Sequence, residues 1–218
     1  MLEVRHLNAS YGQAQALFDV SLRVPTGSMA VVQGLNGAGK STLLKSIMGL
    51  MQNVSGEVLW MGQSLDQLAP HERSHCGLGY VPEDRRLFSA LTVRQNLEIA
   101  ASGPRRQLRK GPTLALADVL NLFPALSKML DRPAAQMSGG EQQMLALGRT
   151  LMTQAQLLLL DEPCEGIAPF LVQSIAQALS QLKNQGFTFL IAEQNQALVQ
   201  LADPVLHLAG GAWVPDTH

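Results

Sequence analysis

The sequence predicts an α/β fold with three parts: a core of alternating strands and helices, an N-terminal antiparallel β subdomain, and a helical insertion. Two observations predict the core. A buried apolar strand at 29–34 leads through a glycine-rich loop into a helical pattern at 40–50, and strands alternate with helices again from 157 to 201. The third observation predicts the insertion, because strand patterns are absent between about 87 and 153.

The elements of the first third follow from short-range patterns. Alternating segments at 2–11 and 21–24, followed by a turn at 25–28 ("PTGS"), predict antiparallel strands. The segment "MAVVQG" predicts a fully buried strand, and "KSTLLKSIMGL" has the apolar spacing of a helix. Two further strands are predicted at 56–61 ("GEVLWM") and 77–82 ("GLGYVP").

The rest of the chain divides into the insertion and the returning core. Helical patterns separated by segments with proline or glycine predict helices at 93–101, 114–122 and 140–152. The core then continues with a strand at 157–161, a helix at 170–184, a strand at 187–192, a helix at 194–201 and short strands at 205–209 and 212–214. We expect a single domain over 1–218, with the core formed by 1–86 and 154–218 and the helical subdomain by 87–153.

The composition excludes several classes of protein. With 218 residues, 46% of them hydrophobic, the chain can bury a full core. Lysine and arginine number 16 against 17 acids, and the longest basic run is "RRQLRK" at 105–110, so no nucleic-acid partner is expected. Cys76 and Cys164 have no metal-ligand spacing and indicate a reduced, cytosolic setting. Without a signal-peptide pattern or about 18 consecutive apolar residues, any role at a membrane is expected outside the bilayer.

The glycine-rich loop matches a phosphate-binding motif. Gly34-x-x-x-x-Gly39-Lys40-Ser41 is the P-loop pattern, in which backbone N–H groups hold phosphates, the lysine reaches the β- and γ-phosphates, and the serine hydroxyl binds Mg²⁺. The following helix directs its positive end at the same anion. The sequence therefore predicts a P-loop NTPase core. Its predicted phosphate-binding residues are Gly34, Asn36, Gly37, Ala38, Gly39, Lys40, Ser41 and Thr42.

An acidic pair follows the buried strand "LLLLD". Asp161 ends this strand, where an α/β sheet presents its ligands, and an acid at this position of P-loop NTPases holds Mg²⁺. Glu162 is expected beside the γ-phosphate, where its carboxylate can orient and deprotonate the attacking water. We predict Lys40 and Glu162 as catalytic residues, and Ser41 and Asp161 as metal ligands.

A second glycine-bearing turn, "MSGGEQQ" at 137–143, precedes the helical pattern at 140–152. Ser138 and Glu141 have the spacing of a capping box. The box does not explain two adjacent glycines. Gly139 and Gly140 leave backbone N–H groups uncovered at a helix N-terminus, which is an anion site in its own right. The turn therefore indicates a second phosphate contact.

"MSGGEQQ" followed by "LLLLDEP" resembles the signature loop and Walker B motif of ABC-transporter ATP-binding subunits, and the resemblance covers essentially the whole chain. It implies a RecA-like ATP-binding core, ATP and Mg²⁺ as cofactors, and two subunits packed head to tail. In that family the signature of each subunit contacts the γ-phosphate held by the other. The resemblance therefore implies that Ser138, Gly139, Gly140 and Glu141 bind nucleotide in the partner's site.

Further positions carry over from the same family. Tyr11 matches the aromatic residue that stacks on adenine, and "EGIAP" at 165–169 resembles the loop that runs along the partner subunit. Glu83 stands where most members have the Q-loop glutamine, and we predict an oxygen contact to Mg²⁺ or water. Gln194 replaces the usual histidine at the γ-phosphate, and we predict it as a third catalytic residue. An amide can donate the same hydrogen bond but cannot carry a proton, so hydrolysis should depend on Glu162.

"VPEDRRLF", "DEPCEGIAP" and "AEQN" together resemble the ATP-binding subunits of branched-chain amino-acid importers. This resemblance implies a peripheral protein on the cytoplasmic face of the inner membrane. Its partners would be a second ATP-binding subunit (the same chain or a paralogue), transmembrane permease subunits and, indirectly, a solute-binding protein. Three alternatives remain: an importer of urea or another small solute, a soluble ABC ATPase acting on nucleic acid or ribosomes, and a P-loop kinase or GTPase active as a monomer.

Overall fold

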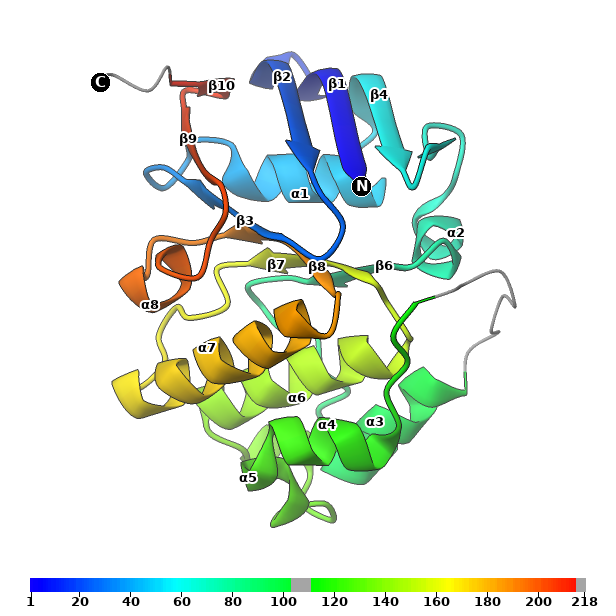
Figure 1. The fold of residues 1–218 in the computed structure, drawn as a ribbon, viewed down its shortest axis with the longest axis vertical. Helices are drawn as coiled ribbons and strands as arrows, with labels where there is room; N and C mark the ends of the chain where they lie inside the picture. Colours follow the sequence, from blue (N-terminus) through cyan, green and yellow to red (C-terminus); the bar gives the residue numbers. More distant parts are fainter. Residues whose placement is uncertain (103–110, 215–218) are drawn as a thin grey trace.

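Helix α1 (Lys40–Met48) lies between two β-sheets in the computed structural model, which describes residues 1–102 and 111–214 (Figure 1). The basic run at 105–110 lies outside the described residues. The upper sheet is antiparallel, in the order β2–β1–β4–β5. Its strands are β1 (Leu2–Tyr11), β2 (Ala14–Val24), β4 (Asn53–Trp60) and β5 (Gln63–Ser64).

The second sheet carries the core of the fold, in the order β10–β9–β3–β8–β7–β6. Its strands are β3 (Met29–Gln33), β6 (Leu78–Val81), β7 (Leu157–Asp161), β8 (Thr188–Ala192), β9 (Val205–Ala209) and β10 (Ala212–Trp213). All neighbours from β9 to β6 pair in parallel, and of the described strands in this sheet only β10 pairs antiparallel, with β9. The carboxyl ends of β3, β8, β7 and β6 therefore meet at one edge, where an α/β sheet binds its ligands.

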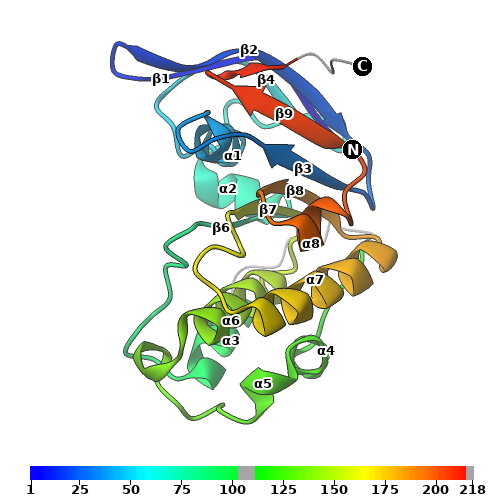
Figure 2. The same cartoon turned by 90° about the vertical axis from the view of Figure 1, so that its left-hand side faces the viewer.

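Helices cover the face of this sheet opposite α1 (Figure 2). Helix α6 is central to this layer and contacts α3, α4, α5, α7 and strand β6. Besides α1, the described part of the chain contains α2 (Pro70–His75), α3 (Val93–Ala101), α4 (Leu116–Leu122), α5 (Pro124–Ser127), α6 (Gly139–Met152), α7 (Pro169–Asn184) and α8 (Gln196–Val199), with a 3₁₀ turn at Ala134–Gln136.

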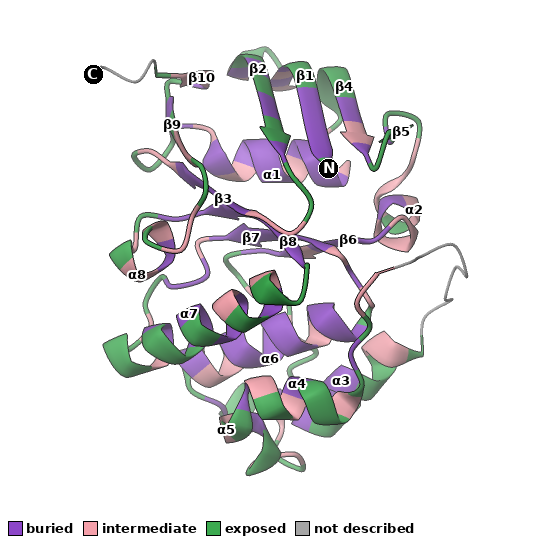
Figure 3. Ribbon diagram, viewed as in Figure 1, coloured by how far each residue is buried: buried purple, intermediate pink, exposed green. Residues whose placement is uncertain are grey.

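Alternate residues of the central strands enter two different hydrophobic cores. Along β3, Met29 and Val31 pack into the core shared with α6 and α7, whereas Ala30 and Val32 pack into the core shared with α1 and the antiparallel sheet. Strands β7 and β8 divide their residues in the same way. Successive side chains of a strand point to opposite faces, so a sheet covered on both faces must be apolar throughout. Figure 3 shows these strands buried along their length.

The observed elements differ from the sequence prediction in a few places. Strand β2 begins at Ala14 rather than at 21, and α2 and α5 were not predicted. The helix expected at 194–201 is shorter, because the side chain of Asn195 caps it by accepting a hydrogen bond from the Ala197 N–H at 3.0 Å. The division into a core and a helical subdomain at 87 and 153 stays a prediction.

Candidate functional site

The phosphate loop joins β3 to α1 and owes its shape to glycine. Gly37 and Gly39 have φ angles of 81° and 106°, in the left-handed region that residues with a Cβ rarely adopt. A Cβ on Gly34 would clash with the carbonyl oxygen of Leu208 on β9. The loop thus curves over the start of α1 because glycine occupies these positions.

Lys40 is buried at the base of the loop. Its Nζ donates to the carbonyl oxygens of Gly34 at 2.9 Å and Leu35 at 3.3 Å, and it forms an ion pair with Glu162 Oε1 at 3.0 Å. The lysine amine therefore lies between the loop and the residue that follows β7. A triphosphate bound on the loop would compete with Glu162 for this charge.

Asp161 is held from two sides. The Ser41 hydroxyl donates to Oδ1 at 2.8 Å, and the Tyr80 hydroxyl donates to Oδ2 at 3.0 Å. Burial raises the pKa of Asp161, and the two hydrogen bonds act in the opposite direction. Burial and the nearby Asp161 also raise the pKa of Tyr80, so this phenol is a hydrogen-bond donor at neutral pH. Ser41 and Asp161 thus bring two oxygen atoms together, which is the ligand chemistry that Mg²⁺ prefers.

Glu162 leaves the sheet with a left-handed backbone, at a φ angle of 47°. Burial acts to raise the pKa of its carboxyl, but hydrogen bonds with Glu165 and Lys40 outweigh burial and lower it. The hydrogen bond with Glu162 raises the pKa of Glu165. Glu162 is therefore the member of this pair that stays ionised, as a general base must be.

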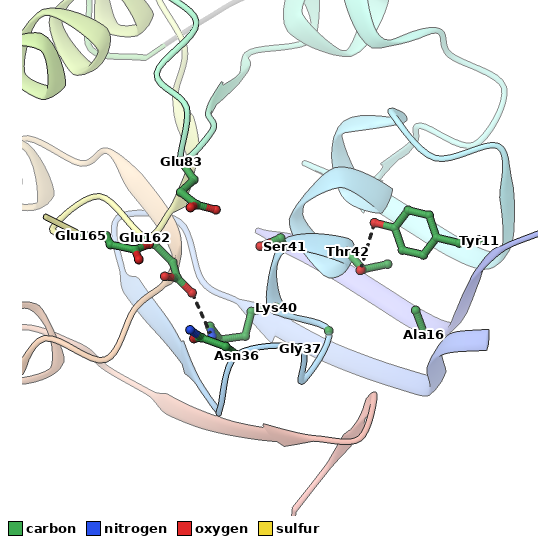
Figure 4. A pocket seen from close by; sticks show the side chains of 11 residues that line it. Tyr11, Ala16, Asn36, Gly37, Lys40, Ser41, Thr42, Glu83, Glu162 and Glu165 are labelled. Carbon is green, nitrogen blue, oxygen red and sulfur yellow. Dashed lines mark hydrogen bonds and ion pairs between the residues drawn. The ribbon is translucent and has the colours of Figure 1, made fainter. Parts of the chain in front are cut away.

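Lys40, Ser41, Glu162 and Glu165 share one cavity of about 400 Å³, and Asp161 is joined to it through its hydrogen bond with Ser41 (Figure 4). Its described lining comprises Tyr11, Ala16, Asn36, Gly37, Gly39, Lys40, Ser41, Thr42, Glu83, Glu162 and Glu165. Tyr11 lies at one end, 53% exposed, with its hydroxyl 3.3 Å from Thr42 Oγ1. Glu83, which follows β6, lies on the side of Glu162 and Glu165. A basic loop at the centre, acids on one wall and an exposed aromatic ring at one end suit a nucleoside triphosphate.

Gln194 reaches the loop from β8. Its Nε2 donates to the Gly34 carbonyl oxygen at 3.0 Å, so its amide lies at the start of the phosphate loop. The preceding Glu193 is buried and accepts hydrogen bonds from the backbone N–H groups of Cys164, Gln194 and Asn195 at 2.8–3.0 Å. Glu193 thus joins the segments that follow β7 and β8.

The second glycine turn starts α6 and does not line this cavity in the described part of the chain. The capping box is present: Ser138 N–H donates to Glu141 Oε2 at 2.8 Å, and Glu141 N–H donates to Ser138 Oγ at 3.4 Å. Glycine at position 140 has a steric explanation that the sequence did not reveal. A Cβ at this position would clash with Leu171 on α7. The space beside Gly139 is bounded by the Arg85 guanidinium, 3.3 Å from where a Cβ would lie.

Sequence reasoning missed three side chains of this site: Tyr80, Glu165 and Glu193. Tyr80 and Glu193 act through strands that become neighbours only when the sheet forms. Glu193 gave a usable signal, since a carboxylate directly after a buried strand of a parallel sheet lies at the ligand-binding edge. Glu165 was seen only as part of the loop 165–169.

Comparisons with known proteins show to which family the chain belongs. The family model described as "ABC transporter" matches residues 17–165. The chain is 43% identical to the high-affinity branched-chain amino acid transport ATP-binding protein BraG of Pseudomonas aeruginosa, over 97% of this chain and 90% of that protein. It is 38% identical to the probable branched-chain amino acid transport ATP-binding protein LivF of Archaeoglobus fulgidus, over 97% and 89%.

Solved structures give the same result. A nucleotide-free ATP-binding cassette from an ABC transporter superimposes with a TM-score of 0.84 at 28% identity, over 98% of this chain and 89% of that one. A dimeric, post-hydrolysis cassette bound to ADP and Pi gives 0.84 at 22% identity, over 98% and 96%, and so supports the fold alone. These findings confirm the expected fold class and the family resemblance. The chain belongs to the ABC transporter family and has the fold of its ATP-binding cassette.

Proposed function

We propose that this chain is the ATP-hydrolysing subunit of an importer for branched-chain amino acids, and that it completes its active site only with a second ATP-binding subunit. One observation carries the second half of this proposal. Lys40, Ser41, Asp161 and Glu162 are brought together by the sheet edge, whereas the turn at 138–141 does not line their cavity. A second subunit would supply that turn.

The residues of the chain divide the chemistry among them. The loop N–H groups and Lys40 bind the phosphates, and Tyr11 stacks on adenine. Glu162 accepts the proton of the attacking water, which contributes about 10²–10⁴-fold to the rate in typical enzymes. The Gln194 amide donates to the γ-phosphate. Ser138, Gly139, Gly140 and Glu141 of the second subunit close the site, through the N–H groups that the first turn of a helix leaves without an intrahelical acceptor.

The donor set around Asp161 fits Mg²⁺. Ser41 and Asp161 would hold the ion, with Glu83 as a further oxygen ligand on the same cavity, and the ion would neutralise charge on the phosphates. Among the described residues no group of three or more His, Cys, Asp or Glu could hold a metal alone. This agrees with an ion that takes the rest of its ligands from the nucleotide and from water.

A permease would dock in the groove on the other side of β6. This groove, of about 480 Å³, lies between α1, α3 and α6 and combines apolar residues such as Phe88 and Ile99 with two arginines. The Arg149 guanidinium lies 5.3 Å from the centre of the Phe88 ring. An apolar permease helix with an acidic residue suits these walls.

The names of the relatives BraG and LivF support branched-chain amino acids as the solute. We also propose a peripheral location at the cytoplasmic face of the inner membrane, with a solute-binding protein as an indirect partner and no nucleic-acid partner. No helix among the described residues has the length and apolar character to cross a membrane.

The proposal is tested with Glu162→Gln, which keeps the size of the side chain and removes its basicity. We expect the variant to bind MgATP with unchanged affinity, to release phosphate about 10²–10⁴-fold more slowly, and to elute as a stable dimer in MgATP. The matched control is Arg94→Ala, at an exposed position of α3 outside the cavity. A monomeric elution with MgATP, or unchanged turnover, would contradict the proposal. The solute is tested separately, by purifying the chain from membranes and identifying the permease and the solute-binding protein that accompany it.

A further inference from the structure

Tyr80 connects a groove with the nucleotide site: it lines the groove and bonds to Asp161, whose partner Ser41 lines the nucleotide cavity. The Tyr80 hydroxyl donates to Asp161 Oδ2 at 3.0 Å, at the edge of the nucleotide cavity. The same residue lines the groove between α1, α3 and α6, on the other side of β6. The side chain is half-buried, and its described neighbours in the groove include Met48, Leu50 and Thr150.

The sheet fixes this arrangement. Strands β6 and β7 are parallel neighbours, with Tyr80 opposite Leu159, so Asp161 lies two residues further along the adjacent strand on the same face. The phenol must therefore extend toward the carboxyl end of the sheet to reach Asp161. The ring fills the distance between the groove and the acid.

The hydrogen bond determines which carboxylate oxygen is available. Tyr80 occupies Oδ2, and Oδ1 accepts from Ser41 at 2.8 Å. With Oδ2 held by Tyr80, Oδ1 faces Ser41 in the first turn of α1. Groups that orient a metal-binding carboxylate typically change metal affinity by about 10–100-fold when they are removed.

We propose that Tyr80 is a positioning residue that orients Asp161 for the divalent cation and transmits occupation of the groove to the nucleotide site. This inference rests on the proposed function, because it takes Asp161 as a metal ligand and the groove as a docking surface. A helix that enters the groove contacts the Tyr80 ring, and displacement of the ring withdraws the hydroxyl from Asp161. A helix in the groove and a cation on Asp161 would therefore favour different positions of the Tyr80 side chain.

The orienting role is tested with Tyr80→Phe, which keeps the ring and removes only the hydroxyl. The measurement is Mn²⁺ binding in the presence of ATP, followed by electron paramagnetic resonance, together with ATP binding in EDTA. We expect Mn²⁺ affinity to fall by at least about tenfold and metal-free ATP affinity to stay within twofold of wild type. Thermal melting checks that the variant is folded.

The control for removing a buried hydroxyl is Ser46→Ala. Ser46 lies on α1, as Ser41 does, but its buried Oγ has no hydrogen-bond partner within residues 1–102 and 111–214. Its removal should leave both affinities unchanged. Wild-type Mn²⁺ affinity in a folded Tyr80→Phe protein would overturn the proposal. An equal loss of metal-free ATP binding would also overturn it, since the effect would then concern the whole cavity.

The link to the groove is tested by filling it. Leu50→Cys, in a Cys76→Ser background, is labelled with a bulky maleimide; Leu50 is exposed and lines the groove, whereas Cys164 is buried. We expect the label to lower Mn²⁺ affinity about fivefold, at the lower end of typical coupling between sites, and to have no effect when Tyr80→Phe is also present. The control label is placed at Val54→Cys on β4, outside the groove.

An unchanged Mn²⁺ affinity after labelling, or a decrease that persists in Tyr80→Phe, would overturn the link. These measurements use the isolated chain and do not depend on dimerisation or on a permease. Failure of the proposed function would appear instead as a monomeric Glu162→Gln protein in MgATP. The two failures are therefore distinguishable.

Discussion

The two glycine-bearing turns of this protein precede helices and differ in what their glycines do. In the phosphate loop, Gly37 and Gly39 adopt left-handed φ angles, and the chain curves around a buried lysine. In the turn at 138–141, neither glycine has a positive φ, and Ser138 caps the helix in the ordinary way. The first turn has a shape that only glycine permits, whereas the second has the shape of a common helix start.

The difference shows that similar sequences can supply unequal parts of a site. The phosphate loop leads into Lys40 and Ser41, which contact the acids Glu162 and Asp161 at the end of β7. The second turn offers only the backbone N–H groups at the N-terminus of α6 and a close approach to α7, which Gly140 permits. We therefore expect the first turn to bind phosphates within its own chain, and the second to add contacts to a site built elsewhere.

The largest effect on kcat/KM is expected from a change in the first turn, the phosphate loop. Lys40→Met removes a buried charge that bonds to the loop and to Glu162. We expect kcat/KM for ATP to fall by about 10³-fold, because charge-assisted hydrogen bonds to phosphate contribute about tenfold to binding and transition-state stabilisation about 10²-fold. Nucleotide binding by the monomer, measured by fluorescence of a labelled ATP, should weaken as well. Unchanged monomer binding would mean that the loop does not hold the phosphates.

Gly139→Asp tests whether the second turn affects turnover without affecting ATP binding by the monomer. A carboxylate at the start of α6 would repel a phosphate, so turnover should fall about 10²-fold, as when one donor to a transition-state anion is removed. ATP binding by the monomer should remain unchanged, because this turn does not line the cavity. Gly139→Ala is the uncharged control. If Gly139→Asp weakens monomer binding, the turn acts within its own chain.

Gly140→Ala tests the steric role of the second glycine. The added Cβ would clash with Leu171, so we expect the free energy of unfolding to decrease by about 1–3 kcal/mol. The measurement is a urea or thermal unfolding curve. In a Leu171→Ala background, which lacks the clashing side chain, Gly140→Ala should decrease the free energy of unfolding less than it does in the wild-type protein. A single variant as stable as wild type would show that the clash is relieved without cost, by rotation of the Leu171 side chain or by movement of α7.

The smallest expected effect belongs to the cap. Ser138→Ala removes the hydroxyl that accepts from the Glu141 N–H, which costs about 0.5–2 kcal/mol of stability at a helix N-terminus. For a chain of this size, a loss of about 1 kcal/mol lowers the melting temperature by roughly 2–4 °C. Ser138→Thr keeps the hydroxyl and serves as the control. Equal melting temperatures for all three proteins would show that the cap contributes nothing.

The buried strands of the sheet were predictable because parallel strands covered on both faces are apolar throughout, as "LLLLD" and "MAVVQ" are. Strand β2 was predicted too short, because only its last residues alternate clearly between exposed and buried. Helix α8 was predicted too long, because apolar spacing alone does not show that Asn195 caps it. Local capping and strand pairing decided these boundaries.

The site was predictable where one local motif carries the chemistry, as for Lys40 and Ser41 in the phosphate loop. Tyr80 and Glu193 were not recognised, because their partners Asp161 and Cys164 lie on other segments of the chain. Glu165 lies only three residues after its partner Glu162, but spacing within a loop does not show that the two carboxyl groups meet. Sequence order does not show that β6, β7 and β8 are neighbours. The placement of Glu83, Gln194 and the turn at 138–141 in a working site stays a prediction, which the Gly139 variants would test for the turn.

The two hydrophobic cores also set the position of the phosphate loop along the chain. A shift of β3 by one residue would exchange Val31 and Val32 between the cores and move Gly34 by about 3.3 Å. Val31 packs beside large side chains of α6 and α7, and Val32 beside those of α1 and the antiparallel sheet. Packing that never touches the nucleotide therefore aligns the loop with Asp161 to within a single residue.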